Sequence, residues 1–174
     1  ILLYPGCVIA EVAEVATRLR NLGVNLRWVS ADRSPIVDQS GLTLTPDAAI
    51  SELAAVHLDG LIVPGGDPAA VMGAAEVRAF VRRCARDGLV AAICAGVLVL
   101  ADAGVLSNRR ATHNYRPPWA TPAIAAFVAE LFDNVNVEDD PSAGVVVDEA
   151  LITALPNATA QFSLAVCHGL GLYD

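Results

Sequence analysis

Short apolar runs alternate along the chain with longer segments whose apolar residues recur at helical spacing. The runs at 1–4, 61–63 and 89–93 contain almost no polar residues, which is typical of parallel strands buried on both faces. Between the last two runs, one helical face is marked by Val77, Phe80, Val81 and Cys84. This alternation predicts an α/β fold with a mostly parallel sheet covered by helices on both faces.

The same pattern predicts the remaining elements. They are a helix over 8–21, a strand over 24–29, a small hairpin over 33–46, a short helix over 47–56, a helix over 121–130 capped by Thr121, strands over 135–138, 145–147 and 151–153, and a final helix over 158–170. The sequence contains no linker, repeat or low-complexity segment. We therefore expect residues 1–174 to form a single domain.

The strand at 89–93 runs directly into Cys94-Ala95-Gly96 and then into a second apolar segment that ends near Gly104. This pattern predicts a sharp strand-to-helix elbow with Cys94 at the bend, facing the first amides of the helix. A helix N-terminus lowers the pKa of a cysteine toward the thiolate, which favours a nucleophile. The alternative is that Cys94 is only a small buried hydrophobe.

Three predicted strands are each followed by a segment with candidate reactive or turn-forming residues, at 5–11, at 64–66 and at Cys94. In an open parallel sheet, the carboxyl ends of the strands form the edge that holds the site. The amides of Gly65 and Gly66, together with that of Ala95, are candidates for an oxyanion hole, unless the two glycines only reverse the chain. The pattern lacks the spacing of a phosphate-binding loop.

Candidate proton-transfer groups lie on two segments. Glu11 and Glu14 are both in the first predicted helix, and the sequence alone does not choose between them. His113 follows a predicted strand end, where a histidine can act as acid or base. His57 and His168 have weaker claims, because one precedes a strand at the opposite edge and the other lies on the final helix.

Composition and charge narrow the function classes. The formal net charge of -8 argues against nucleic acid or an anionic membrane as partner, and the apolar runs are too short to span a bilayer. The four cysteines form no CxxC pair, so we expect no metal site and a reducing, cytoplasmic environment. Cys84 and Cys167 fit a core, whereas Cys7 is a candidate resolving thiol.

The chain resembles the ThiJ/PfpI superfamily, relatives of class I glutamine amidotransferases and of the Parkinson-associated protein deglycase. The resemblance covers nearly the whole chain, and the pairing of Pro64-Gly65-Gly66 with Ile93-Cys94-Ala95-Gly96 is its most specific part. The family implies a flavodoxin-like three-layer sandwich, usually a homodimer, without a metal or another cofactor. The matching segments are 4–11, 61–66, 91–96, 100–106, 111–113, 145–148 and 151–154.

Position by position, the resemblance makes Cys94 the nucleophile, Glu11 its acidic partner and His113 the neighbouring histidine. Gly66 and Ala95 become the donors to the oxyanion. The peptidase-like branch of the family has a histidine directly after the nucleophile, where this chain has Ala95, which weighs against a protease or amidase.

The substrate pocket is expected to include Gly65 and Tyr115, with Arg116 and Trp119 as further candidates for its wall. We expect a cysteine-dependent enzyme that acts on small reactive carbonyls, as a glyoxalase or deglycase does, with a small electrophile as partner. One alternative is a stress protein that senses oxidants through Cys94. Others are isonitrile hydration, amide or peptide hydrolysis, or a domain that only binds a partner.

Overall fold

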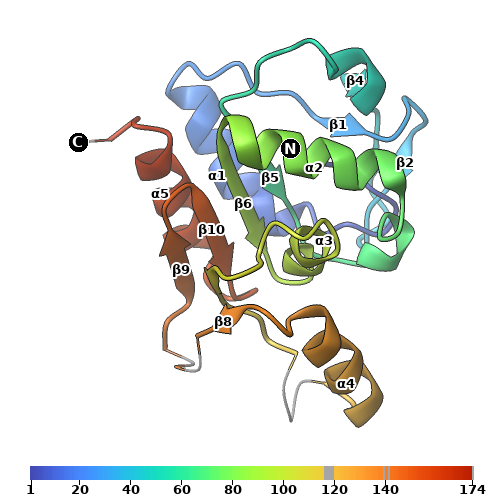
Figure 1. Ribbon diagram of the computed structural model, residues 1–174. Helices are drawn as coiled ribbons and strands as arrows, with labels where there is room; N and C mark the ends of the chain where they lie inside the picture. Colours follow the sequence, from blue (N-terminus) through green and yellow to red (C-terminus); the bar gives the residue numbers. More distant parts are fainter. Residues whose placement is uncertain (116–119, 139, 141, 174) are drawn as a thin grey trace.

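The computed structural model describes residues 1–115, 120–138, 140 and 142–173 (Figure 1). All elements named below lie within these ranges. Among the described residues, no helix combines the length and the apolar character that a bilayer span requires.

A four-stranded sheet with the order β5–β6–β10–β9 forms the centre of the molecule. The strands β5 (Gly60–Val63), β6 (Leu89–Ile93) and β10 (Leu151–Ala154) are parallel, and β9 (Val145–Asp148) is antiparallel to β10. The predicted tight turn joins β9 to β10. The carboxyl ends of β5 and β6 therefore lie side by side, as the predicted site requires.

The N-terminal segment extends this sheet beyond β5. The Leu2 amide donates to the Ile62 carbonyl at 2.9 Å, and Leu2 also forms a parallel bridge to Val29. Val29 belongs to β1 (Val29–Ser30), which pairs in parallel with β4 (Ala48–Ala49). The first predicted strand is thus an extended segment in the sheet, although its regular pairing is limited to one bridge.

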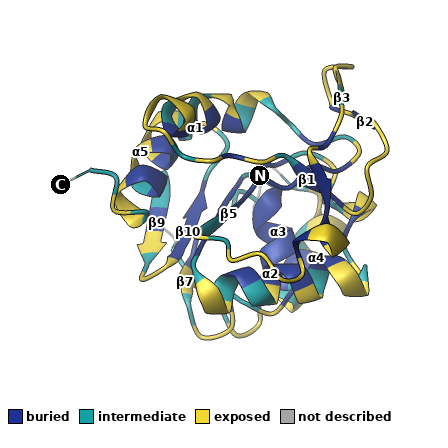
Figure 2. Ribbon diagram, turned by 90° about the horizontal axis from the view of Figure 1, so that it is seen from above, coloured by how far each residue is buried: buried dark blue, intermediate teal, exposed yellow. Residues whose placement is uncertain are grey.

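Helices cover both faces of the sheet (Figure 2). On one face, α1 (Ala10–Asn21) packs against α5 (Thr159–Gly169). The other face is covered by α2 (Ala75–Asp87) and α3 (Gly96–Asp102). The chain is thus a flavodoxin-like three-layer α/β sandwich.

The residues of β6 show why its sequence is uniformly apolar. All five are buried, and they alternate between two hydrophobic clusters. Val90 and Ala92 join the cluster that contains α2 and α3, whereas Leu89, Ala91 and Ile93 join the cluster that contains α1 and α5. A polar side chain at any of these positions would be buried against a helix.

Smaller elements surround the sheet. They are a hairpin of β2 (Ile36–Val37) and β3 (Thr43–Leu44), the 3-10 turns η1 (Ile50–Leu53) and η2 (Pro68–Ala70), and a parallel pair of β7 (Arg110–Ala111) and β8 (Asn136–Val137). The hairpin predicted over 33–46 is confirmed. The short helix predicted over 47–56 is limited to the 3-10 turn η1, because the residues before it pair as β4. Of the strand predicted over 24–29, only Val29 is in a strand, as the first residue of β1.

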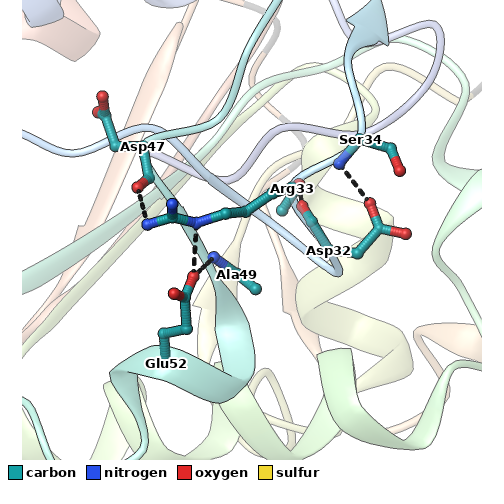
Figure 3. A network of polar contacts seen from close by, with 7 residues as sticks. Asp32, Arg33, Ser34, Asp47, Ala49 and Glu52 are labelled. Carbon is teal, nitrogen blue, oxygen red and sulfur yellow. Dashed lines mark hydrogen bonds and ion pairs between the residues drawn. The ribbon is translucent and has the colours of Figure 1, made fainter.

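Polar contacts around Arg33 explain the short turn η1 (Figure 3). The Arg33 guanidinium donates to Glu52 Oε2 and to the Asp47 carbonyl, both at 2.8 Å. Glu52 Oε2 also accepts the Ala49 amide at 2.7 Å. These bonds lower the pKa of Glu52, the Ala49 amide contributing most. The carboxylate therefore caps the start of η1 and ties it to the preceding loop.

The helix α4 (Pro122–Leu131) projects from the sandwich (Figure 1). It begins as predicted, with the Thr121 hydroxyl accepting the Ile124 amide at 3.3 Å. Val128 is its only buried residue, and Ile124 and Phe127 are exposed.

Candidate active site

Cys94 occupies the predicted elbow between β6 and α3. Its φ of 56° lies in the left-handed region, which is unusual for a residue with a side chain. The Cys94 amide donates to the Ala154 carbonyl of β10 at 2.9 Å, and its carbonyl accepts the Val97 amide at 3.3 Å. The sheet and the first turn of α3 therefore both hold this strained residue in place.

The Gly65-Gly66 turn lies directly against Cys94. A Cβ at Gly65 would come within 2.6 Å of Cys94 Cβ and 2.9 Å of Sγ, and it would also collide with the Glu11 carboxylate. Gly66 has a φ of 123°, and its amide donates to the Cys94 sulfur together with the amide of Ala95. The two glycines therefore do more than reverse the chain, because a side chain at Gly65 would fill the space that Glu11 and Cys94 share.

Glu11, not Glu14, reaches this space. Glu11 Oε2 accepts the Gly65 amide at 2.9 Å, and the Glu11 carboxyl is hydrogen-bonded to Cys94. Glu14 instead forms an ion pair with Arg18 at 2.9 Å, and 40% of its side chain is exposed. The alternative that the sequence left open is thus decided by the geometry of the first turn of α1.

Glu11 and Cys94 form a pair whose pKa values are shifted mainly by burial. Burial raises the pKa of Glu11, although hydrogen bonds with Cys94 and Gly65 partly offset the effect. Burial also raises the pKa of Cys94; the charge and hydrogen bond of Glu11 raise it further, and the amides of Ala95 and Gly66 lower it. The negative charge of either group therefore disfavours ionisation of the other, so the two titrate as a coupled pair.

This arrangement corrects one expectation from the sequence. The helix amides do favour the thiolate, but the pKa of Cys94 is raised, not lowered, because desolvation and the adjacent carboxylate outweigh them. Cys94 is therefore not a thiol that ionises alone. Its proton has an acceptor in contact, which is the arrangement of a nucleophile and its base.

His113 and Tyr115 lie beyond the end of β7. His113 Nδ1 accepts the Tyr115 amide at 3.1 Å, so a neutral imidazole carries its proton on Nε2. The His113 ring also contacts Phe132 edge-on, with ring centroids 4.6 Å apart. Burial raises the pKa of Tyr115 to about 12, and the charges of Cys94 and Glu11 add to this shift. Tyr115 therefore lies within electrostatic range of Cys94 and Glu11, and its amide ties it to His113.

The remaining cysteines and two other histidines are placed in the core or on the surface. Cys84 and Cys167 are buried in α2 and α5, as predicted. His57 is exposed beside Asp59, and His168 packs against the Tyr173 ring. Cys7 is buried and forms an isolated antiparallel β-bridge with Gly66. Burial raises the pKa of its thiol. Its role as a resolving thiol stays a prediction.

Two predicted wall residues, Arg116 and Trp119, lie outside the described residues. Among the residues that the structure does describe, no three His, Cys, Asp or Glu side chains are grouped to hold a metal ion. Tyr4, which was not predicted to belong to the site, has its hydroxyl in contact with the carbonyls of Pro64 and Gly65. Its signal in the sequence is a single polar atom in an otherwise apolar run.

The chain is similar to known proteins of one family along most of its length. A model of the DJ-1/PfpI family matches residues 1–168. Protein dj-1beta of Drosophila melanogaster is 28% identical over 175 residues, which cover 98% of this chain and 87% of that protein. The crystal structure of that protein superposes with a TM-score of 0.82, covering 99% of this chain and 89% of that one, at 26% identity.

Two further relatives have names that state an activity. A deglycase of Thermococcus kodakarensis is 33% identical over 97 residues, covering 55% of this chain and 58% of that protein. A glutathione-independent glyoxalase of Caenorhabditis elegans is 26% identical over 150 residues, covering 85% and 74%. With the fold, the elbow and the family match in agreement, the chain belongs to the DJ-1/PfpI family.

Proposed function

We propose that this protein is a cysteine-dependent enzyme that converts small reactive carbonyl compounds, with Cys94 as nucleophile. The observation that carries the proposal is the set of partners of the Cys94 sulfur, which are the Glu11 carboxyl and the amides of Gly66 and Ala95. A base and two oxyanion donors around one sulfur are what addition to a carbonyl requires.

In the proposed mechanism, Cys94 Sγ adds to the aldehyde carbon of a dicarbonyl such as methylglyoxal. The thiol proton moves to Glu11, and the oxygen that gains the electron pair accepts hydrogen bonds from the Gly66 and Ala95 amides. Glu11 and His113 then move the protons that convert the resulting hemithioacetal into a thioester of lactate. Water releases lactate and returns the proton to the pair, so the net reaction is hydration and rearrangement.

The relatives support this class of reaction. The relatives named above include a deglycase and a glutathione-independent glyoxalase, and this chain has a strand-to-helix elbow at Cys94 with two glycines against it. A third relative, an isonitrile hydratase of Pseudomonas putida, is 30% identical over 115 residues, covering 65% of this chain and 49% of that protein. Hydration of an isonitrile also begins with attack on an electrophilic carbon, so it is the first alternative substrate to assay.

The direct test is lactate formation from methylglyoxal by the purified protein. The wild type is expected to turn over, and Cys94→Ala to show only the background rate. Cys84→Ala is the matched control, because it removes another thiol that is buried in α2, away from the elbow. Absence of lactate above the Cys94→Ala background would refute the carbonyl reaction, and the isonitrile assay with the same variants would follow.

A second candidate is a redox function of the same sulfur. Cys94 is partly exposed, whereas Cys7, Cys84 and Cys167 are all buried. We expect mild peroxide to convert Cys94 selectively to an oxidised acid whose negative charge the Gly66 and Ala95 amides stabilise. Mass spectrometry of the treated protein tests this, since oxidation spread over several cysteines would contradict it.

Assembly and compartment are part of the proposal. We expect a cytoplasmic homodimer, as the family resemblance and the unpaired cysteines suggest. Light scattering coupled to size-exclusion chromatography measures the mass in solution. A monomer of about 18.1 kDa would contradict the dimer.

A further inference from the structure

The hydroxyl of Tyr4 lies behind the turn that forms the candidate active site. Tyr4 is fully buried, at 0% exposure, and it ends the N-terminal extended segment beside β5. Its hydroxyl lies 2.6 Å from the Pro64 carbonyl oxygen and 2.9 Å from that of Gly65. One hydroxyl thus contacts two successive carbonyls of the same turn.

Each of these carbonyls shares a peptide unit with an amide that faces the site. The Pro64 carbonyl belongs to the unit whose N–H is that of Gly65, which donates to Glu11 Oε2 at 2.9 Å. The Gly65 carbonyl belongs to the unit whose N–H is that of Gly66, which donates to the Cys94 sulfur. The Tyr4 hydroxyl and the two members of the pair are therefore at opposite ends of the same two peptide dipoles.

A peptide group whose oxygen accepts a hydrogen bond becomes a stronger donor at its nitrogen, because the hydrogen bonds polarise one another. We propose that Tyr4 is a positioning residue whose hydroxyl strengthens and orients the Gly65 and Gly66 amides, and thereby favours negative charge on Glu11, on the Cys94 sulfur and on the substrate oxygen. Its effect on turnover rests on the proposed function, whereas its effect on the sulfur does not.

The competing explanation is that Tyr4 only fills space. Its ring belongs to the hydrophobic cluster that contains α2 and α3, and a phenylalanine would fill the same volume. The Gly65 carbonyl also keeps a second donor, because it accepts the Val8 amide at 2.8 Å. Tyr4→Phe therefore removes the oxygen while leaving the ring and part of the turn's hydrogen bonding in place.

The experiment measures the rate at which iodoacetamide alkylates Cys94 across pH in the native protein. For Tyr4→Phe, weaker amide donors should move the midpoint of this profile upward by about half a unit or more. With methylglyoxal as substrate, kcat should fall by roughly 3- to 10-fold while KM changes little, as expected when donors to a developing charge weaken. Tyr173→Phe is the control, because the Tyr173 hydroxyl contacts Arg18 and not the turn.

A second variant covers the case in which Tyr4→Phe does not fold. Replacing Tyr4 by 3-fluorotyrosine makes the hydroxyl a stronger donor, so the alkylation midpoint should move downward. An unchanged midpoint in a folded Tyr4→Phe protein, or in the fluorinated protein, would overturn the proposal, even if turnover or melting temperature fell. If the wild type forms no lactate, the proposed function fails, and the alkylation profiles still decide the role of Tyr4.

Discussion

Two carboxylates of this protein, Glu11 and Asp102, are both withdrawn from water but have opposite surroundings. Asp102, at the end of α3, has a side chain only 9% exposed and receives two hydrogen bonds from Arg78, at 2.6 and 2.9 Å, and one from the Gly73 amide at 2.9 Å. Arg78 lowers the pKa of Asp102. Glu11 also accepts a glycine amide, but its other partner is the Cys94 thiol, and burial raises its pKa.

The difference lies in the counterion. Asp102 has a guanidinium and stays ionised, so its charge fastens α2 to α3 and to the segment before α2. Among the described residues, no cationic side chain forms an ion pair with Glu11, and its carboxyl is hydrogen-bonded to the Cys94 sulfur instead. The comparison teaches that a buried carboxylate with a fixed cation supports the fold, whereas one paired with a second acid is suited to moving a proton.

Glu11→Gln should give the largest effect on activity. An amide can still accept the Gly65 hydrogen bond, but it cannot take a proton from Cys94, so we expect turnover to fall by about 100- to 10,000-fold. Stability at neutral pH should not fall, because the substitution removes a charge that burial disfavours. Lactate formation and a thermal melt measure the two effects, and a variant that melts at a lower temperature but keeps its turnover would reverse the comparison.

Gly65→Ala tests the glycine that serves Glu11, and Gly73→Ala tests the one that serves Asp102. The new Cβ at position 65 would meet Cys94 Cβ at 2.6 Å, and such a displacement should lower turnover about 100-fold. At position 73, nothing lies within 4 Å of the new Cβ, but φ is +83°, so the expected loss is about 1 kcal/mol of stability. Equal turnover in both variants would contradict the tight fit at Gly65.

Asp102→Asn should lower stability by about 1 to 2 kcal/mol and leave turnover unchanged. The expected loss is modest because the Arg78 side chain is 39% exposed and water can partly replace its partner. Urea unfolding at pH 7 measures the change. A loss of turnover without a loss of stability would show that Asp102 influences the chemistry.

The two carboxylates should also respond to pH with opposite signs. The lowered pKa of Asp102 stabilises the fold above the ordinary aspartate range, and this contribution is lost as pH falls through the lowered pKa. The raised pKa of Glu11 means that its protonated form favours the folded state, and this contribution is lost as pH rises through the raised pKa. Melts of both variants from neutral pH into acid should therefore each approach the wild type from opposite sides, and Asp102→Asn should do so only below the ordinary aspartate pKa.

Glu14→Gln should give the smallest effect. Glu14 pairs with Arg18 one helical turn away, and both side chains are partly exposed, so the pair is worth about 0.5 kcal/mol or less. Turnover should not change. This variant is the neighbour control for Glu11→Gln on the same helix, and a shared loss of turnover would point to α1 itself instead of the Glu11 carboxyl.

Much of the fold was predictable because the apolar pattern reports burial directly. The five apolar residues of β6 and the spaced face of α2 are buried as the sequence predicts. The two-residue strands were not predictable in length, because regular pairing depends on partners that are distant in sequence, as between Val29 and Ala48. The segment over 47–56 has helix-like spacing, but the Arg33 and Glu52 contacts hold it as a strand and a tight turn.

The candidate site was predictable in its residue types but not in its energetics. Cys94 and the two glycines could be placed because each follows a strand of one parallel sheet. The choice between Glu11 and Glu14 depends on how α1 is rotated over the sheet, which periodicity alone does not determine. The direction of the pKa shift of Cys94 depends on how deeply two groups are buried together, and a sequence does not contain that distance.

The left-handed backbone at Cys94 has an evolutionary consequence. A glycine would adopt a φ of 56° without strain, so the fold alone would favour losing the side chain at this bend. A laboratory selection for heat resistance, without a demand for turnover, should therefore enrich glycine there. Persistence of a thiol at this position through such a selection would mean that the bend is comfortable for it.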